Sequence, residues 1–105
     1  MNISDLMTRL PGAFNASAAG NTRCTVQFNL NPPAYATIAD GQCVVTPGSA
    51  PKADVTLNVS NDDLIKLLTG KLSPVMAFMT GKLKVEGDLG LGQRVMGFFD
   101  SSKLV

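Results

Sequence analysis

The chain has 105 residues, 45% of them hydrophobic, which fits a single domain over residues 1–105 with one core. Nine Lys and Arg residues are scattered along it and nearly balanced by eight Asp and Glu, for a net charge of +1. Nucleic-acid binding needs a dense basic patch, so this charge pattern argues against a nucleic-acid partner.

The sequence contains no recognisable targeting or membrane segment. Polar residues such as Asp5 interrupt the N-terminal apolar residues, and no apolar run approaches the length of about 18 residues that is typical of a membrane span. Ser-Lys-Leu at 102–104 would be a peroxisomal signal only at the end of the chain, and Val105 follows it. We therefore expect a soluble, cytoplasmic protein.

A short amphipathic helix is expected at the start of the chain. Apolar residues recur at helical spacing over residues 3–10, behind Asn2 or Ser4 as the capping residue. Pro11 and Gly12 are expected to end this helix.

Three strands follow the first helix. Apolar and polar residues alternate over 23–30, which is typical of a strand with one buried face. Two more short strands, at 34–39 and 42–46, are joined by Asp40 and Gly41, a favoured hairpin pair. The three strands should form an antiparallel meander.

The next segment predicts a fourth strand and a helix. Alternation returns at 54–59, and Ser60 then caps a helix of about ten residues that Gly70 ends. The sequence TGKL at 69–72 recurs at 80–83. We interpret both copies as the same helix-stop signal rather than as duplicated units.

The remainder predicts helix, strand and helix. Ser73 and Pro74 open a helix whose next residues, 75–79, are all apolar. Residues 82–86 alternate as a fifth strand, and Asp88 caps a last helix. The apolar residues of this last helix are Leu89, Leu91, Val95, Met96, Phe98 and Phe99.

Because every strand alternates, the sheet should have one apolar and one polar face. The helices must then pack together on the apolar face, which predicts a two-layer α+β domain. The polar face is expected to meet solvent through Arg23, Thr25, Gln27, Asn29, Thr56, Asn58, Lys82, Lys84 and Glu86.

The glycine-rich run GKLKVEGDLGLG at 81–92 does not match a nucleotide-binding loop. Gly90 and Gly92 fit the first two glycines of G-x-G-x-x-G, but Val95 stands in the third position. We interpret the run as a strand, a turn and a helix start. Glycines inside that helix indicate close backbone approach or a mobile hinge.

Catalytic and metal-binding patterns are also missing from the sequence. The chain has no histidine to serve as the base for a Ser or Cys nucleophile, and Cys24 and Cys43 lack metal-ligand spacing. The neighbouring Asp62 and Asp63 suit a helix N-terminus. We therefore expect a protein that is not an enzyme, with no cofactor, no metal and two buried, reduced thiols.

The apolar segment 75–79 points beyond an ordinary core helix. A helix on a single sheet needs one apolar stripe, whereas this one is apolar all round, and Met96, Phe98 and Phe99 add further apolar surface. A bound lipid or a second subunit could cover the surplus. The adaptable methionines slightly favour a lipid.

Residues 53–95, ADVTLNVSNDDLIKLLTGKLSPVMAFMTGKLKVEGDLGLGQRV, resemble the signature half of the sterol carrier protein 2 family. The resemblance implies a five-stranded mixed sheet of order 3-2-1-4-5, with helices on one face and an apolar tunnel between the layers. In that order one strand separates Cys24 from Cys43, a gap of roughly 9–10 Å that is beyond disulfide reach.

The resemblance also implies non-catalytic lipid binding and transport, with a sterol-like molecule, fatty acid or fatty acyl-CoA held in the tunnel. The chain stops soon after Phe99, as expected of a short, bacterial-type member with a wider tunnel mouth. Carried over by position, the ligand-binding residues would be Phe28, Leu57, Leu68, Met76, Phe78, Met79, Met96, Phe98 and Phe99.

A second hypothesis remains open at this point. The apolar helices could instead bind a twin subunit, or an enzyme of lipid or isoprenoid-quinone metabolism for which this chain is an accessory protein. Transient contact with a membrane is compatible with both hypotheses.

Overall fold

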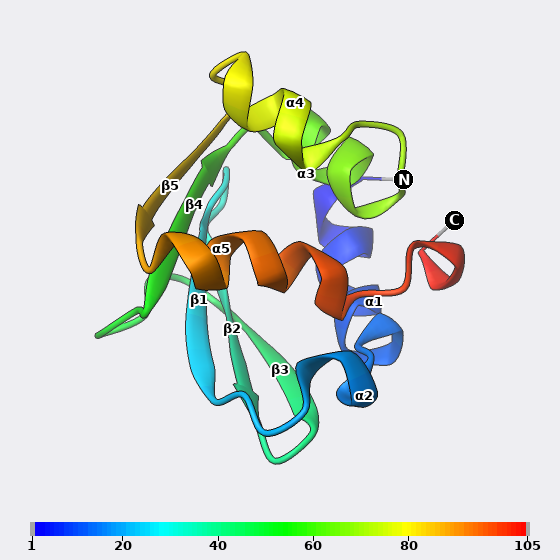
Figure 1. Ribbon diagram of the computed structural model, residues 1–105, viewed down its shortest axis with the longest axis vertical. Coiled ribbons are helices and arrows are strands. Elements are labelled where there is room, and N and C mark those ends of the chain that lie inside the picture. Colours follow the sequence, from blue (N-terminus) through cyan, green and yellow to red (C-terminus); the bar gives the residue numbers. More distant parts are fainter. Residues whose placement is uncertain (1, 105) are drawn as a thin grey trace.

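The computed structural model describes residues 2–104 and contains one five-stranded sheet (Figure 1). The strand order is β3-β2-β1-β4-β5, as the family resemblance predicted. β1 runs parallel to β4 and the other neighbouring strands are antiparallel, so the sheet is mixed. The strands span Cys24–Asn29 (β1), Ala34–Ala39 (β2), Gln42–Pro47 (β3), Val55–Val59 (β4) and Leu83–Gly87 (β5).

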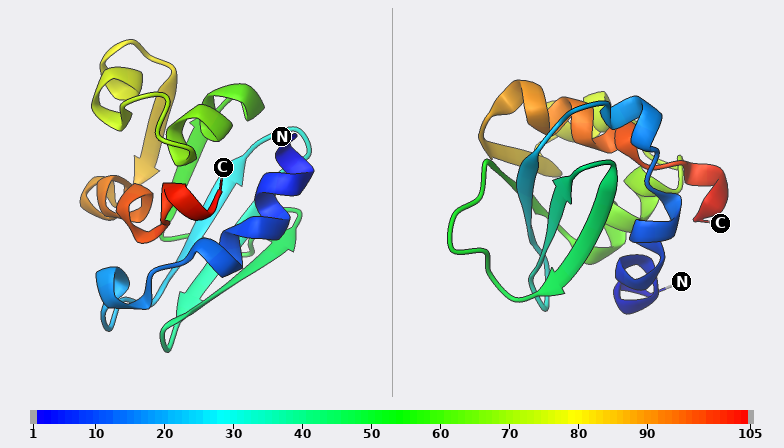
Figure 2. Two further views of the ribbon diagram at one scale, coloured as in Figure 1. Left: turned by 90° about the vertical axis from the view of Figure 1, so that its right-hand side faces the viewer. Right: turned by 90° about the horizontal axis from the view of Figure 1, so that it is seen from below.

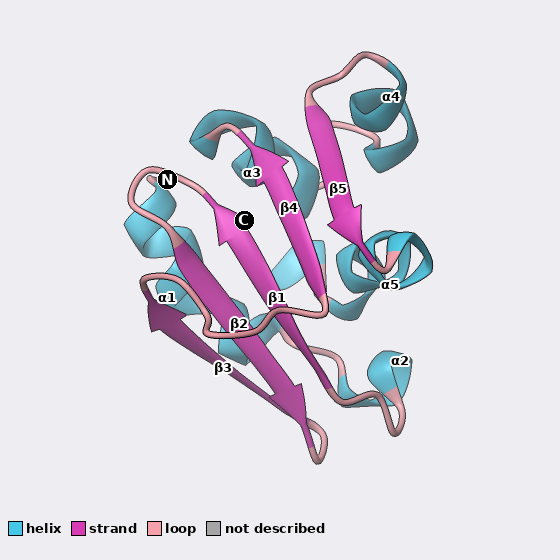
Figure 3. Ribbon diagram, turned by 90° about the vertical axis from the view of Figure 1, so that its left-hand side faces the viewer, coloured by secondary structure: helices cyan, strands magenta, loops and turns pink. Residues whose placement is uncertain are grey.

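The helices lie on one face of the sheet, which confirms the two-layer α+β prediction (Figure 2, Figure 3). α1 contacts β3 and α3, whereas α5 contacts β4 and β5. No helix within residues 2–104 is long and apolar enough to cross a bilayer. The helices span Ile3–Ala13 (α1), Ala16–Ala19 (α2), Asn61–Leu68 (α3), Pro74–Met79 (α4) and Leu89–Val95 (α5), with 3-10 turns at Met96–Phe98 (η1) and Ser101–Lys103 (η2).

Three helices begin at the capping residues that the sequence indicated. Asn2, Ser60 and Asp88 each accept a hydrogen bond from the backbone N–H three residues later, at 2.8, 3.1 and 3.0 Å. Of the two candidates for the first helix, Asn2 is therefore the cap. Each side chain satisfies one of the amide groups that a helix N-terminus leaves without a partner.

Both copies of TGKL end a helix in the same way. Gly70 and Gly81 have φ angles of 81° and 78°, which glycine adopts without steric cost. The lysine after each glycine donates its N–H to the carbonyl five residues earlier, at 2.8 and 2.9 Å. The repeat is therefore a helix-stop signal, as interpreted, and α4 is confined between Pro74 and Gly81.

The predicted end of the first helix is wrong, because α1 continues through Pro11 to Ala13. Proline removes a backbone hydrogen bond inside a helix, but Leu10 and Ala13 are almost completely buried, and that burial offsets the loss. The four-residue helix α2 was not predicted. Asn15 caps it by accepting a hydrogen bond from the Ala18 N–H at 3.2 Å.

The core lies between the inner face of the sheet and the helices. From the sheet, the central strands β1 and β4 contribute Val26, Phe28, Val55 and Leu57, each at most 1% exposed. From the helices, the members of the same cluster that are 0% exposed are Leu6, Leu10, Leu64, Ala77 and Val95.

One residue of the expected polar face, Gln27, is buried rather than solvated, with 6% of its surface exposed. Its amide nitrogen donates to the carbonyls of Ala34 and Gly48, at 3.2 and 3.3 Å, and its Oε1 accepts from the Ala50 N–H at 2.7 Å. The loop after β3 therefore covers the outer face of the sheet at this point. The buried amide is tolerated because both its ends have partners.

α5 lies unusually close to the sheet at Gly92. A Cβ placed there would be 2.6 Å from Val85 Cγ1 and 3.3 Å from Val55 Cγ2. At Gly90, earlier in the same helix, the nearest atom to a Cβ would be Asp88 Oδ1 at 3.5 Å, an ordinary contact. The close approach expected for this glycine run therefore occurs at Gly92.

Alanine at these two glycines should have opposite effects on stability. Gly92→Ala should lower the free energy of unfolding by about 1–2 kcal/mol, because displacing two stiff valines outweighs the gain in helix propensity. Gly90→Ala, the matched control, should raise it by up to about 1 kcal/mol. Urea denaturation monitored by circular dichroism measures both, and equal stability of the two variants would contradict this account of the packing.

Candidate functional site

An apolar groove of about 360 Å³ opens beside α4, between β5 and α5. This volume is near the lower end of the range of about 300–1,000 Å³ found for small-molecule sites. The groove is lined by Pro74, Val75, Phe78, Met79, Leu83, Val85, Leu89, Gly92, Gln93 and Met96.

The strand β5 and the helix α5 form the floor and one wall of the groove. Leu83 and Val85 are two residues apart, so both point to the helix side of the sheet. Gln93 comes from α5, and Met96 comes from the 3-10 turn η1 that directly follows it. Because Gly92 has no side chain, this wall stands directly against the floor at Val85.

The other wall is α4, which lies beyond the end of β5 rather than over the sheet (Figure 1). Within this helix only Ala77 is buried. Val75, Met76, Phe78 and Met79 are 66%, 54%, 52% and 74% exposed. The apolar segment thus has a solvent-exposed face that its sequence did not predict. The reason is that α4 has only six residues and lies beyond the end of β5, so that the sheet does not cover it.

The structure divides the nine ligand-binding residues expected from the sequence into two groups. Phe78, Met79 and Met96 line the groove, and Met76 lies on the exposed surface of α4 next to it. The other five are buried in the core and are not among the lining residues: Phe28, Leu57, Leu68, Phe98 and Phe99.

Phe98 and Phe99 form an aromatic cluster with Phe14. The ring centroids of Phe98 and Phe99 lie 6.4 and 5.9 Å from that of Phe14, both in edge-on arrangements. Such pairs stabilise a core beyond the burial of their area. These ring contacts hold Phe98 and Phe99, which follow α5, against the C-terminal end of α1.

Seven lining residues were not singled out from the sequence. The alternation in 82–86 assigned Leu83 and Val85 to the inner face, but it could not show that a groove rather than a helix lies above them. The sequence did offer one signal, an apolar residue directly after the Asp88 cap. In the structure this residue, Leu89, is 52% exposed. The residues missed are Pro74, Val75, Leu83, Val85, Leu89, Gly92 and Gln93.

The lining contains no charged side chain, and its one polar side chain is that of Gln93. Among residues 2–104, no cluster of three or more His, Cys, Asp or Glu side chains could hold a metal ion. The groove can therefore enclose an apolar group and offers one amide, at its rim, to a polar one.

The two cysteines lie in the core and are free, as predicted. Ile38 of β2 pairs with both of them, so one strand separates them. Burial raises the pKa of Cys43 to about 11. The pKa of Cys24 is also raised, mainly by burial and to a smaller extent by the negative charge of Asp54. Both thiols therefore stay protonated near neutral pH and are poor nucleophiles.

Comparisons with known proteins give a consistent result. Residues 6–100 match the SCP-2 sterol transfer family. The chain is 52% identical over 44 residues to hydroxysteroid dehydrogenase-like protein 2 of Xenopus tropicalis, a match covering 42% of this chain and 11% of that protein. It is 41% identical over 58 residues to sterol carrier protein 2 of Oryctolagus cuniculus, covering 55% of this chain and 11% of the relative.

A solved structure shows the same fold at nearly full length. The solution structure of palmitated SCP2L2 from Aedes aegypti superposes with a TM-score of 0.73 at 20% identity, covering 92% of this chain and 93% of that one. These two relatives are much longer proteins, of which the matched stretches span about a tenth.

The buried thiols should make stability depend on pH above 9. Below the unfolded-state pKa of 9.0 the neutral thiol is present in both states, and as pH rises toward the folded-state pKa of about 11 only the unfolded chain loses its proton. The contribution of Cys43 to the free energy of unfolding should thus fall by about 1 kcal/mol by about pH 10.

Urea denaturation at about pH 8 and about pH 10 tests this, with Cys43→Ala as the reference that lacks the thiol. The variant should lose less stability than the wild type over this interval, whatever its stability at the lower pH. Equal losses for the two proteins would show that Cys43 does not titrate as described.

Proposed function

This chain belongs to the SCP-2 sterol transfer family, and on that premise we propose that it binds and transfers a lipid in the groove beside α4, without catalysis. One observation carries the proposal: the groove joins α4, β5 and α5 at the place where five of the six exposed large hydrophobic side chains of residues 2–104 lie. An apolar ligand would remove that surface from water.

The lining determines which part of a ligand the groove would take. Since it has no charged side chain, a carboxylate or phosphate held inside would lose its hydration without an ionic partner, which is strongly unfavourable. We therefore propose that the hydrocarbon part enters and the polar head stays at the rim, within reach of Gln93. Fatty acids, fatty acyl-CoA and sterol-like molecules all meet this requirement.

The buried members of the expected ligand-binding set would extend the site inward. Val85 of the groove pairs across the sheet with Leu57, and Leu57 pairs with Phe28. These three side chains therefore form a continuous apolar row from the groove into the space between sheet and helices. A long ligand would follow this row beneath Leu68, Phe98 and Phe99, opening the tunnel that the family resemblance implies.

Ligand binding can be tested by titrating the purified, lipid-free protein with a fluorescent fatty acid and with unlabelled fatty acid followed by NMR. We expect saturable binding, with the largest amide shifts at Val75, Leu83, Val85 and Met96. Met79→Gln and Met96→Gln should each weaken binding by about five- to tenfold, because a polar amide replaces apolar contact worth about 1 kcal/mol.

Val44→Gln is the matched control, since Val44 is a 56% exposed valine on β3, away from the groove. It should leave the affinity unchanged. Absence of uptake by the wild type, or equal weakening by the control and the groove variants, would refute lipid binding at this site.

A further inference from the structure

We propose that α4 and the residues flanking it form a docking surface for an anionic lipid bilayer, so that the groove opens toward the membrane. This goes beyond ligand binding in the groove, because it concerns the outer surface of α4 and a two-dimensional partner rather than a single molecule. Three observations support it: where apolar side chains are exposed, where charge accumulates, and how the two are arranged.

The exposed apolar side chains are concentrated at one end of the molecule. Among the described residues, six large hydrophobic side chains are exposed, and five of these are on α4 or at the start of α5. Met76 is not one of the groove-lining residues, so a ligand in the groove would leave it uncovered. Single exposed apolar residues are common, but a cluster of this kind marks an interaction site.

Positive charge accumulates around the α4 part of this surface. Residues 64–85 contain Lys66, Lys71, Lys82 and Lys84 and no Asp or Glu, although the rest of the chain has five basic residues against eight acidic ones. The acidic residues that follow this stretch in sequence, Glu86 and Asp88, come just before Leu89 at the start of α5. All four lysines are exposed. The one ion pair found between residues 2 and 104 joins Arg23 and Asp40, at another part of the molecule.

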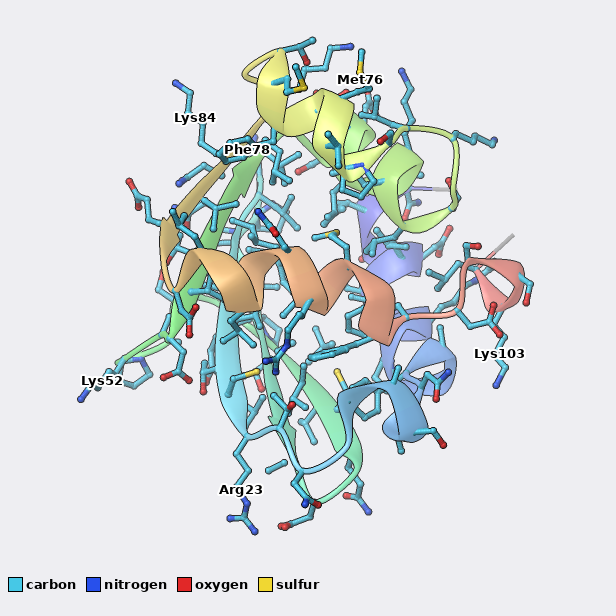
Figure 4. The ribbon with its side chains drawn as sticks, viewed as in Figure 1. Arg23, Lys52, Met76, Phe78, Lys84 and Lys103 are labelled. Atoms are coloured by element: carbon cyan, nitrogen blue, oxygen red, sulfur yellow. The ribbon has the colours of Figure 1, made fainter. Side chains whose placement is uncertain are left out.

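Two of the lysines flank α4 directly, and Lys84 lies on β5, on the face of the sheet opposite Leu83 and Val85. Lys71 and Lys82 belong to the two TGKL turns, before and after α4. Figure 4 shows Lys84 at the same end of the molecule as Met76 and Phe78, whereas Lys52 and Lys103 point away from it. An apolar patch flanked by lysines matches the acyl layer and the anionic headgroups of a bilayer together.

A second copy of the chain fits this surface less well. In a two-fold dimer the same patch would face itself, which would bring the lysines of one copy near those of the other. Like charges placed across an interface oppose association. An anionic membrane instead satisfies both parts of the surface, and it would let a lipid pass between bilayer and groove without crossing water.

The chain has no tryptophan, so a single introduced one reports on its own surroundings. With Met76→Trp in the full chain, vesicles of phosphatidylcholine mixed with phosphatidylglycerol should shift the emission to the blue, and vesicles of phosphatidylcholine alone should do so far less. Val44→Trp is the matched control and should not shift with either. Added salt should weaken the interaction.

Replacing Lys71, Lys82 and Lys84 together by Gln should weaken vesicle binding by about 100-fold, at about fivefold per lysine. The matched control replaces Lys52 and Lys103 by Gln and should retain binding. Fatty-acid uptake without vesicles should be kept by both variants, which separates this test from that of the groove.

Three results would overturn the proposal: equal binding to neutral and anionic vesicles, equal emission shifts for Met76→Trp and Val44→Trp, or unchanged binding by the lysine variant. A sedimentation experiment supplies a further one. Suppose that the wild type does not bind vesicles and is a dimer, and that Met76→Gln converts it to a monomer. The surface is then a subunit interface instead.

Discussion

The site depends on one packing contact, the approach of α5 to the sheet at Gly92. Without a side chain at this residue, the helix rests directly on Val85 and Val55, and a Cβ would be 2.6 Å from a valine methyl group. This contact fixes one wall of the groove against its floor. Leu83 and Val85 of β5 line the groove between this helix and α4.

The second wall follows from two local signals that act on a short segment. Pro74 begins α4 and the TGKL turn at Gly81 ends it, so the helix has only six residues and lies beyond the sheet edge. A helix of this length is not stable by itself in water, so packing must hold it in place. Ala77 is its one buried side chain, and the other apolar side chains of the helix remain exposed to solvent. Local chain geometry thus produces an exposed apolar surface that hydrophobic packing alone would have removed.

Much of this architecture could be predicted from the sequence, and the failures have identifiable causes. Caps and helix stops were predictable because each depends on a few neighbouring residues, as at Ser60 and Asp88. The path of α1 through Pro11 and the burial of Gln27 were not, because both depend on contacts with distant segments. The strand order came only from the family resemblance, since alternation assigns faces and not neighbours.

The same distinction between local signals and contacts with distant segments explains which residues of the candidate site could be predicted. Phe78, Met79 and Met96 were found because they belong to segments with more apolar residues than one sheet can cover. Phe98 and Phe99 were expected beside them on a continuous helix, but the chain tightens to a 3-10 turn at Met96 and then forms a bridge to Phe14. A 3-10 helix has fewer residues per turn than an α-helix, which redirects the two rings into the core. The glycine run at 81–92 thus has a packing role, because Gly92 brings a helix against a strand and an apolar groove lies beside that contact.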